Sequence, residues 1–220
     1  MSKIAIDVVL LPDEEMTNKA VEVSKKQSEK ANDKILLNKK NCLPHISLTM
    51  GAIDERDIEK VSQALNKIAV QFTFLKLIAD NYRSSTTPAG NVISEFSIKK
   101  TEDLQNLHVM IMEKLKPYLS YDVTVDMVYS PPKVEEITLF WIKGYLKNSS
   151  FDKFKPHITL GYGRVENIVT PIAFSASTLA LCHLGNYCTC RKTLHAIRLN
   201  KGKGEPAFDS PRTNHMKLRV

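Results

Sequence analysis

The stretch Leu43-Pro44-His45-Ile46-Ser47-Leu48-Thr49-Met50-Gly51 recurs later in the chain as Lys155-Pro156-His157-Ile158-Thr159-Leu160-Gly161-Tyr162-Gly163. When the two are aligned on the histidine, the proline, isoleucine, hydroxyl residue, leucine and final glycine fall at the same offsets. Each copy is a short alternating run, which predicts a half-buried strand. Because side chains two positions apart on a strand share a face, each histidine should lie beside its hydroxyl residue, with the isoleucine and leucine facing the core.

Two histidines on strands can supply the proton transfers of phosphodiester cleavage. One group must take a proton from the attacking oxygen, and another must give one to the leaving oxygen. Imidazoles, whose ordinary pKa lies near 6.5, can do both near neutral pH. We therefore predict that His45 and His157 are the catalytic pair and that Ser47 and Thr159 bind phosphate. A lone histidine in an apolar strand would more simply be structural, but a repeated phrase is hard to attribute to packing alone.

The composition is that of an ordinary globular protein with a basic surplus. The 220 residues are 43% hydrophobic and 25% charged, with a net charge of +7. No run approaches the roughly 20 apolar residues of a membrane span, and the first residues do not resemble a signal peptide. We therefore expect a cytoplasmic monomer that does not associate with membranes. The surplus lies mostly after Gly163, where nine basic residues stand against three acidic ones, and it favours RNA, an oligonucleotide or a cyclic nucleotide as partner.

The four cysteines do not form a recognisable framework. They are Cys42, Cys182, Cys188 and Cys190. Their scatter in a chain of this size does not predict disulfides. Together with His183, the last three prompt the question of a zinc site, but their spacing matches none of the usual ligand patterns. Small buried side chains are the simpler interpretation, and neither histidine motif carries a carboxylate or cysteine to complete a metal site.

The remaining periodicities predict an α+β fold. Strands are expected over residues 3–11, 42–50 (ended by Gly51), 72–80, 92–98, 137–146, 155–163, 172–184 and 192–199. Helices are expected over residues 13–32, 54–70 and 102–118, with a turn-rich stretch at 81–91 and no continuous element over 121–136. The repeated motif in two mixed segments suggests two pseudo-symmetric lobes of antiparallel sheet with flanking helices, and a central cleft that carries both motif strands. We expect one bilobal domain over residues 1–200 and a basic, flexible tail over 201–220.

The paired motifs resemble those of the two-histidine (2H) phosphoesterase superfamily, which includes bacterial 2′,5′ RNA ligase-like proteins, cyclic nucleotide phosphodiesterases and 2′,5′-oligoadenylate phosphodiesterases. The resemblance spans roughly residues 1–200, including the opening strand and the closing strand pair. It implies a site between two lobes that needs no metal or cofactor, with His45 and His157 as the acid–base pair and Ser47 and Thr159 on phosphate. The first motif departs from the family pattern in carrying serine where threonine is commoner. Tyr162 and Arg164, just after the second motif, are further candidates for substrate contacts.

The sequence therefore predicts a metal-independent phosphodiesterase that acts on RNA or nucleotide phosphodiesters, either a 2′,3′-cyclic phosphate or a 2′,5′ linkage. Three alternatives stay open. The same site could run in reverse as a 2′,5′ RNA ligase, or the chain could be a non-catalytic RNA- or nucleotide-binding module. Zinc chemistry at residues 182–190 is the third. The sequence does not distinguish the linkage isomer or which histidine is the base.

Overall fold

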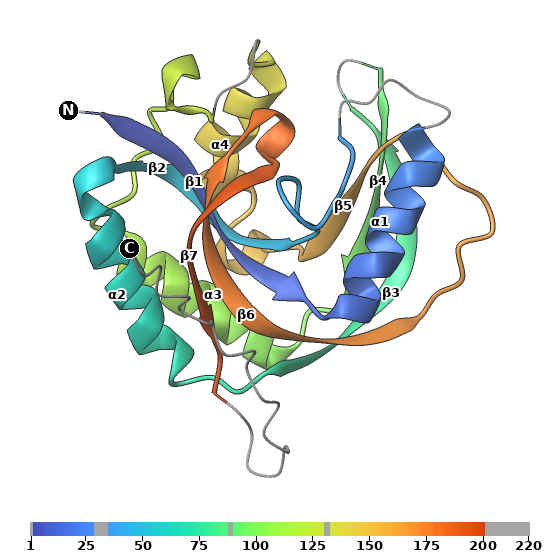
Figure 1. Ribbon diagram of the computed structural model, residues 1–220, viewed down its shortest axis with the longest axis horizontal. Coiled ribbons are helices and arrows are strands. Elements are labelled where there is room, and N and C mark those ends of the chain that lie inside the picture. Colours follow the sequence, from blue (N-terminus) through green and yellow to red (C-terminus); the bar gives the residue numbers. More distant parts are fainter. Residues whose placement is uncertain (1, 29–34, 88–89, 130–132, 201–220) are drawn as a thin grey trace, which may run out of the picture.

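The computed structural model describes residues 2–28, 35–87, 90–129 and 133–200. Four α-helices and seven strands make up the described fold (Figure 1). The strands are β1 (Lys3–Pro12), β2 (Ile46–Asp54), β3 (Leu75–Thr86), β4 (Val92–Ile98), β5 (His157–Tyr162), β6 (Ile172–Leu184) and β7 (Cys190–Arg198). The helices are α1 (Glu14–Ser28), α2 (Ile58–Ala69), α3 (Glu102–Leu115) and α4 (Glu136–Asn148), with four short 3-10 turns, η1 (Glu55–Asp57), η2 (Val125–Met127), η3 (Phe151–Lys153) and η4 (Asn186–Cys188).

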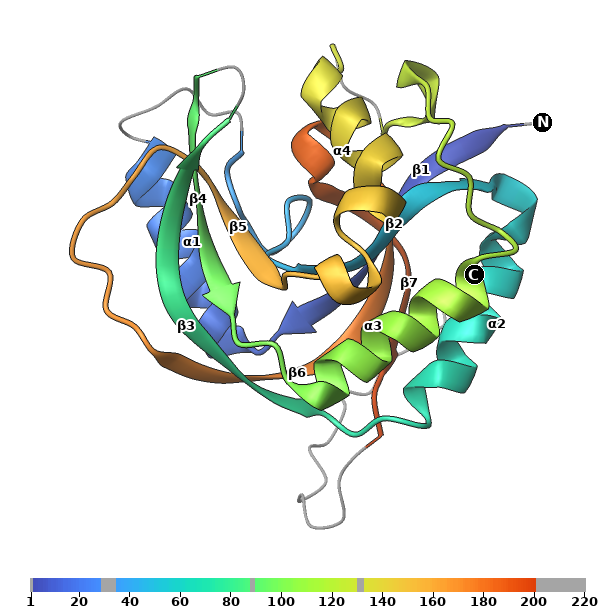
Figure 2. The same ribbon diagram turned by 180° about the vertical axis from the view of Figure 1, so that it is seen from behind.

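All seven strands belong to one antiparallel sheet. Its hydrogen-bonded path runs β2-β1-β6-β3-β4-β5, and β7 pairs with β6. The long strand β6 joins the two lobes, because its first part pairs with β3 and its later part with β1. The sheet curls, so the motif strands β2 and β5, at opposite ends of the path, come close to each other (Figures 1 and 2). The predicted α+β class and the two-lobed arrangement around the motif strands are confirmed.

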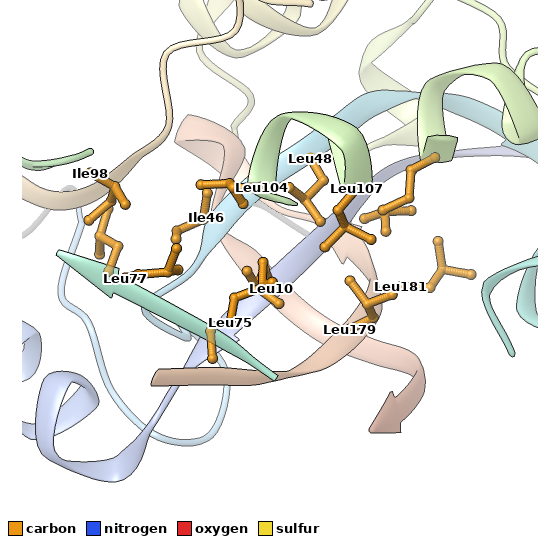
Figure 3. Close-up of a cluster of buried hydrophobic side chains, with 14 of the residues drawn as sticks. Leu10, Ile46, Leu48, Leu75, Leu77, Ile98, Leu104, Leu107, Leu179 and Leu181 are labelled. Atoms are coloured by element: carbon orange, nitrogen blue, oxygen red, sulfur yellow. The ribbon is translucent and has the colours of Figure 1, made fainter. Parts of the chain in front are cut away.

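The core lies between the sheet and the helices α2 and α3. Alternate residues of β1 point into it, and so do the apolar positions of β2, where Ile46 and Leu48 are fully buried. Figure 3 shows leucines and isoleucines from β1, β2, β3, β4, β6 and α3 meeting in this cluster. Helix α3 begins at Glu102, as predicted, directly after Thr101, whose Oγ1 accepts a hydrogen bond from the Leu104 backbone N–H. Helix α1 covers the other lobe by packing on β5.

Residues 137–146 form helix α4, so the predicted strand there is wrong. The stretch is rich in β-branched and aromatic residues, whose strand preference misleads when the context is not known. Thr138, Ile142 and Tyr145 are the buried positions, at intervals of four and three residues, which is the spacing of one helix face. The tertiary burial of that face outweighs local preference.

Two predicted boundaries are also wrong. Strand β2 does not end at Gly51 but continues to Asp54, because its pairing with β1 extends to Lys3 opposite Asp54. Ala52 also exchanges two backbone hydrogen bonds with Ser120. A Cβ at Gly51 would lie 2.9 Å from Leu119 Cδ2, so this glycine permits close approach rather than ending the strand. Strand β3 extends to Thr86 through the stretch expected to be turn-rich. The last residues of the predicted 13–32 helix and the 201–220 tail lie outside the described residues.

Cys182 and Cys190 form a disulfide between β6 and β7, so the prediction that the cysteines remain unpaired is wrong for these two. Sequence spacing did not show that the two strands pair and bring these residues together. Cys42 and Cys188 are free. The described residues hold no group of three or more histidine, cysteine, aspartate or glutamate side chains arranged to hold a metal ion. The described part of the chain also has no helix long and apolar enough to cross a membrane.

Candidate active site

Both motif strands line a single cavity of about 370 Å³. The structure brings together His45 and Ser47 from the first motif with His157 and Thr159 from the second. On both strands the alternation is as predicted, since the histidine and hydroxyl residue are half-buried and the intervening isoleucine and leucine are fully buried. The sheet path explains the convergence, because its curl brings its two end strands face to face.

Each histidine is oriented by the same backbone contact. His45 Nδ1 lies 2.7 Å from the carbonyl oxygen of Leu43, and His157 Nδ1 lies 2.9 Å from that of Lys155. A carbonyl can only accept, so Nδ1 carries the hydrogen in both rings, and Nε2 is the atom free to exchange a proton. In both motifs the contact spans the intervening proline, whose restricted backbone fixes where the preceding carbonyl points. The proline of the repeated phrase thus has a role that the sequence did not reveal.

A carboxyl group from the neighbouring strand stands beside each Nε2 atom. Asp7 Oδ2, on β1, is 3.8 Å from His45 Nε2, and Glu95 Oε2, on β4, is 3.9 Å from His157 Nε2. Glu95 also pairs with Arg83 at 3.0 Å. The two acids therefore repeat the symmetry of the motifs, although nothing in the motifs themselves predicts them.

The two halves differ in burial. The side chain of Asp7 is fully buried, whereas that of Glu95 is 25% exposed; the side chains of His45 and His157 are 13% and 42% exposed. Burial raises the pKa of Asp7 well above its ordinary range, against the opposing effect of the hydrogen bond from Ser47 and of the nearby Thr49 backbone. Burial also lowers the pKa of His45 below 6.5, and the charge of His157 adds to this. The first half of the site therefore favours neutral groups.

The two hydroxyls have different partners. Ser47 Oγ donates to Asp7 Oδ2 at 2.5 Å, so its hydrogen is directed away from the cavity when Asp7 is ionised. Among the described residues, Thr159 Oγ1 has no recorded hydrogen-bond partner and faces the cavity from a half-buried position. The hydroxyls of the two motifs are thus not equivalent.

The other two candidates lie outside the lining. Tyr162 is buried, and its ring packs edge-on against Tyr187 with centroids 5.5 Å apart. Tyr187 itself lines the cavity, so Tyr162 supports a residue of the cavity wall. Arg164 is exposed and does not contribute to the lining.

Sequence reasoning missed several residues of the cavity wall. They include the cations Arg83, Lys153 and Lys155 and the aromatic residues Trp141 and Tyr187. Lys155 stands at the start of the second motif copy, but no local pattern marks the other four, because they come from separate segments that only the fold brings together. Asp7 did leave a signal, since it is the one charged residue inside an apolar strand.

The fold is shared with known structures of low sequence identity. TT0787 of Thermus thermophilus superposes with a TM-score of 0.53 at 16% identity, covering 90% of this chain and 99% of that one. Escherichia coli LigT complexed with NADP+ gives 0.51 at 14% identity, with 90% and 99% covered. LigT complexed with phosphate gives 0.50 at 12% identity, with 91% and 100% covered. The chain has the fold of these proteins. No protein-family model matches the sequence, and no curated protein matches it significantly.

Proposed function

We propose that this chain is a two-histidine phosphoesterase that acts on RNA or nucleotide phosphodiesters, either 2′,3′-cyclic phosphates or 2′,5′ linkages, without a metal or cofactor. The observation that carries the proposal is the pair of imidazoles in one cavity, each with Nδ1 committed to a carbonyl and Nε2 left to exchange a proton. LigT, which has the same fold, has been captured with phosphate and with ATP. This likeness supports the choice of a phosphorylated substrate.

The asymmetry of the cavity supports one assignment of the two proton transfers. His45 is the more buried ring, and its lowered pKa keeps it neutral, so it is the general base that takes a proton from water through Nε2. The half-exposed His157 is then the general acid that gives its Nε2 proton to the leaving oxygen. For a cyclic phosphate, the attacking water forms one P–O bond while the ester bond opposite it breaks, and one proton is taken and one given.

The wall of the cavity suits an oligonucleotide or nucleotide. Arg83, Lys153 and Lys155 supply positive charge at its rim, where phosphate groups are attracted. Trp141 and Tyr187 offer aromatic faces, and base–aromatic stacking is worth about 1–3 kcal/mol per base. We propose that stacking on these two rings makes the cavity select a substrate that carries a base over a simple phosphate ester. Tyr162 and Arg164 remain proposals, the first as support for Tyr187 and the second as a peripheral phosphate contact.

The test is a panel of 2′,3′-cyclic nucleotides and 2′,5′-linked oligoadenylates, incubated with the purified protein in EDTA with identification of the products. We expect turnover of at least one class by the wild type and turnover about 10²–10⁴ slower by the His45→Ala/His157→Ala double variant. His195→Ala is the matched control, because this β7 histidine bonds to Asn66 of α2 and is absent from the cavity lining. Binding without turnover of any substrate would contradict the proposal and favour the non-catalytic binding module. Formation of 2′,5′ linkages from paired ends would show the ligase direction.

A further inference from the structure

Asp7 is a fully buried acid beside the proposed phosphate site, and within the described ranges it lacks an arginine such as the one that balances its counterpart Glu95. Its Oδ2 atom is 3.8 Å from His45 Nε2, the atom that would face the substrate in the function proposed above. An ionised carboxylate there would repel a phosphate bound between the two histidines. It would also hold the single hydrogen of the Ser47 hydroxyl, which would then be unable to donate to the phosphate.

The surroundings of Asp7 also disfavour its ionised form. On β1 it lies between Ala5 and Val9, each of which belongs to a small cluster of buried apolar residues. Its second oxygen, Oδ1, is buried and makes no hydrogen bond of good geometry to any residue that the structure describes. An unpaired carboxylate oxygen away from water is costly, and a neutral acid reduces that cost.

The groups that face Asp7 do not supply a strong positive charge. They are His45 just before β2, Tyr145 on α4, Cys188 in η4 and Cys182, which lies opposite Asp7 in the β1–β6 pairing and is held in the disulfide. In the described part of the chain, His45 is the one cationic group within ion-pair distance of Asp7. The competing arrangement is therefore an ion pair in which Asp7 has passed its proton to His45. Burial acts against that arrangement twice, because it raises the pKa of Asp7 and lowers the pKa of His45.

We propose that Asp7 is a positioning residue of this site and works in its protonated form, donating to Ser47 Oγ so that the Ser47 hydroxyl is free to donate to a phosphate oxygen. The proposal rests on the function proposed above and deepens it. One carboxylic acid, by staying neutral, gives the phosphate a donor, removes a repelling charge and leaves His45 unprotonated as the base. Loss of its proton at higher pH would turn Ser47 back towards Asp7 and weaken the binding of phosphate.

The direct test compares the affinity of the wild type and Asp7→Asn for inorganic phosphate by calorimetry from pH 5 to pH 9. An asparagine amide mimics the neutral acid, since it can donate to Ser47 at every pH. We expect similar affinities at pH 5 and a variant-to-wild-type ratio that rises about tenfold or more by pH 9. The ionisation of phosphate and of His45 affects both proteins and largely cancels in the ratio. A ratio that stays flat while the Asp7 carboxyl group titrates within this range would overturn the proposal.

Two further variants distinguish the proposed effect of Asp7 on the Ser47 hydroxyl from the effect of removing any negative charge. In the Ser47→Ala background, Asp7→Asn should produce a smaller rise in the ratio, because the hydroxyl through which Asp7 acts is gone. Asp122→Asn removes an exposed carboxylate elsewhere and should leave the ratio at one across the range. An equal rise in Asp122→Asn would overturn the proposal.

A measurement on the wild type covers the case in which Asp7→Asn does not fold. The carbon-13 shift of the Asp7 carboxyl group should report a protonated acid well above the ordinary pKa of 3.8. Titration near 3.8 would overturn the proposal, whatever the variants do. If the wild type neither binds phosphate nor turns over any phosphodiester, the proposed function fails. If it does both but the carboxyl titrates normally, only the inference about Asp7 fails.

Discussion

The half of the site on β1 and β2, where helix α4 packs on β2, holds a largely buried histidine and a fully buried acid, whereas the histidine and the acid of the half on β4 and β5 are partly exposed. Both halves use the same local device, a histidine held through Nδ1 by the carbonyl two residues earlier. What differs is the carboxyl group beside each ring, which is fully buried for Asp7 and partly exposed and paired with Arg83 for Glu95. A repeated motif can therefore orient two histidines in the same way, while the burial of the neighbouring carboxyl groups gives the two rings different electrostatic environments.

The largest expected effect is the loss of turnover when the histidine of either half is replaced. Each of His45→Ala and His157→Ala should lower turnover by about 10²–10⁴, since each removes one acid–base partner. The two losses should differ in pH dependence. The acidic limb of the pH–rate profile should disappear in His45→Ala, because the base is lost, and the alkaline limb in His157→Ala, because the acid is lost. Profiles of the residual activity that keep the same limbs in both variants would contradict the assignment.

The next effect compares the two hydroxyls. Thr159→Ala should weaken phosphate binding by roughly 10–100-fold at every pH, because a hydrogen bond to a charged group contributes about 1.5–3 kcal/mol. Ser47→Ala should cost as much at pH 5 but much less at pH 9, where an ionised Asp7 already holds the Ser47 hydroxyl. Titration of both variants with inorganic phosphate checks this. Equal losses that do not change with pH would show that the two hydroxyls are equivalent.

A smaller effect concerns stability and compares the two carboxyl groups. Because the pKa of Asp7 is raised in the folded protein, the folded state binds the proton more tightly than the unfolded chain. The free energy of unfolding should therefore fall as pH rises above 3.8 and through the folded pKa, by about 1.4 kcal/mol for each unit of the shift. Asp7→Asn should lack this contribution and be the more stable protein at alkaline pH, as measured by urea unfolding at several pH values.

Glu95→Gln is the matched control for that measurement. Its partly exposed pair with Arg83 is screened by water, so the change should be within about 1 kcal/mol and should shrink in salt. A pH dependence equal to that of Asp7→Asn would contradict the account of the two environments.

The sequence predicted the parts of this molecule that rest on local repetition. The alternation around His45 and His157 predicted the faces of both strands, and the helical periodicity from residue 102 onward predicted α3. The stretch at 137–146 could not be assigned correctly, because its side chains favour a strand locally and only packing on β2 makes it a helix. The disulfide from Cys182 depended on the pairing of β6 with β7, which local spacing does not reveal.

The site, like the fold, was predictable only where it rests on local repetition. The motif residues were found because the same motif occurs twice in the sequence. Glu95 was missed because its role depends on the pairing of β4 with β5, where it lies opposite Thr159. Asp7 stood out as an acid in an apolar strand, but its meaning required the distance to His45.

The central claim is that His45 and His157 serve one reaction, and a double-mutant cycle tests it most directly. With one 2′,3′-cyclic nucleotide as substrate, kcat would be measured for the wild type, both single alanine variants and the double variant. Residues that act as a unit are not additive, so the double variant should be about as slow as the slower single variant. Losses that simply multiply, or a double variant that retains wild-type turnover, would contradict the account.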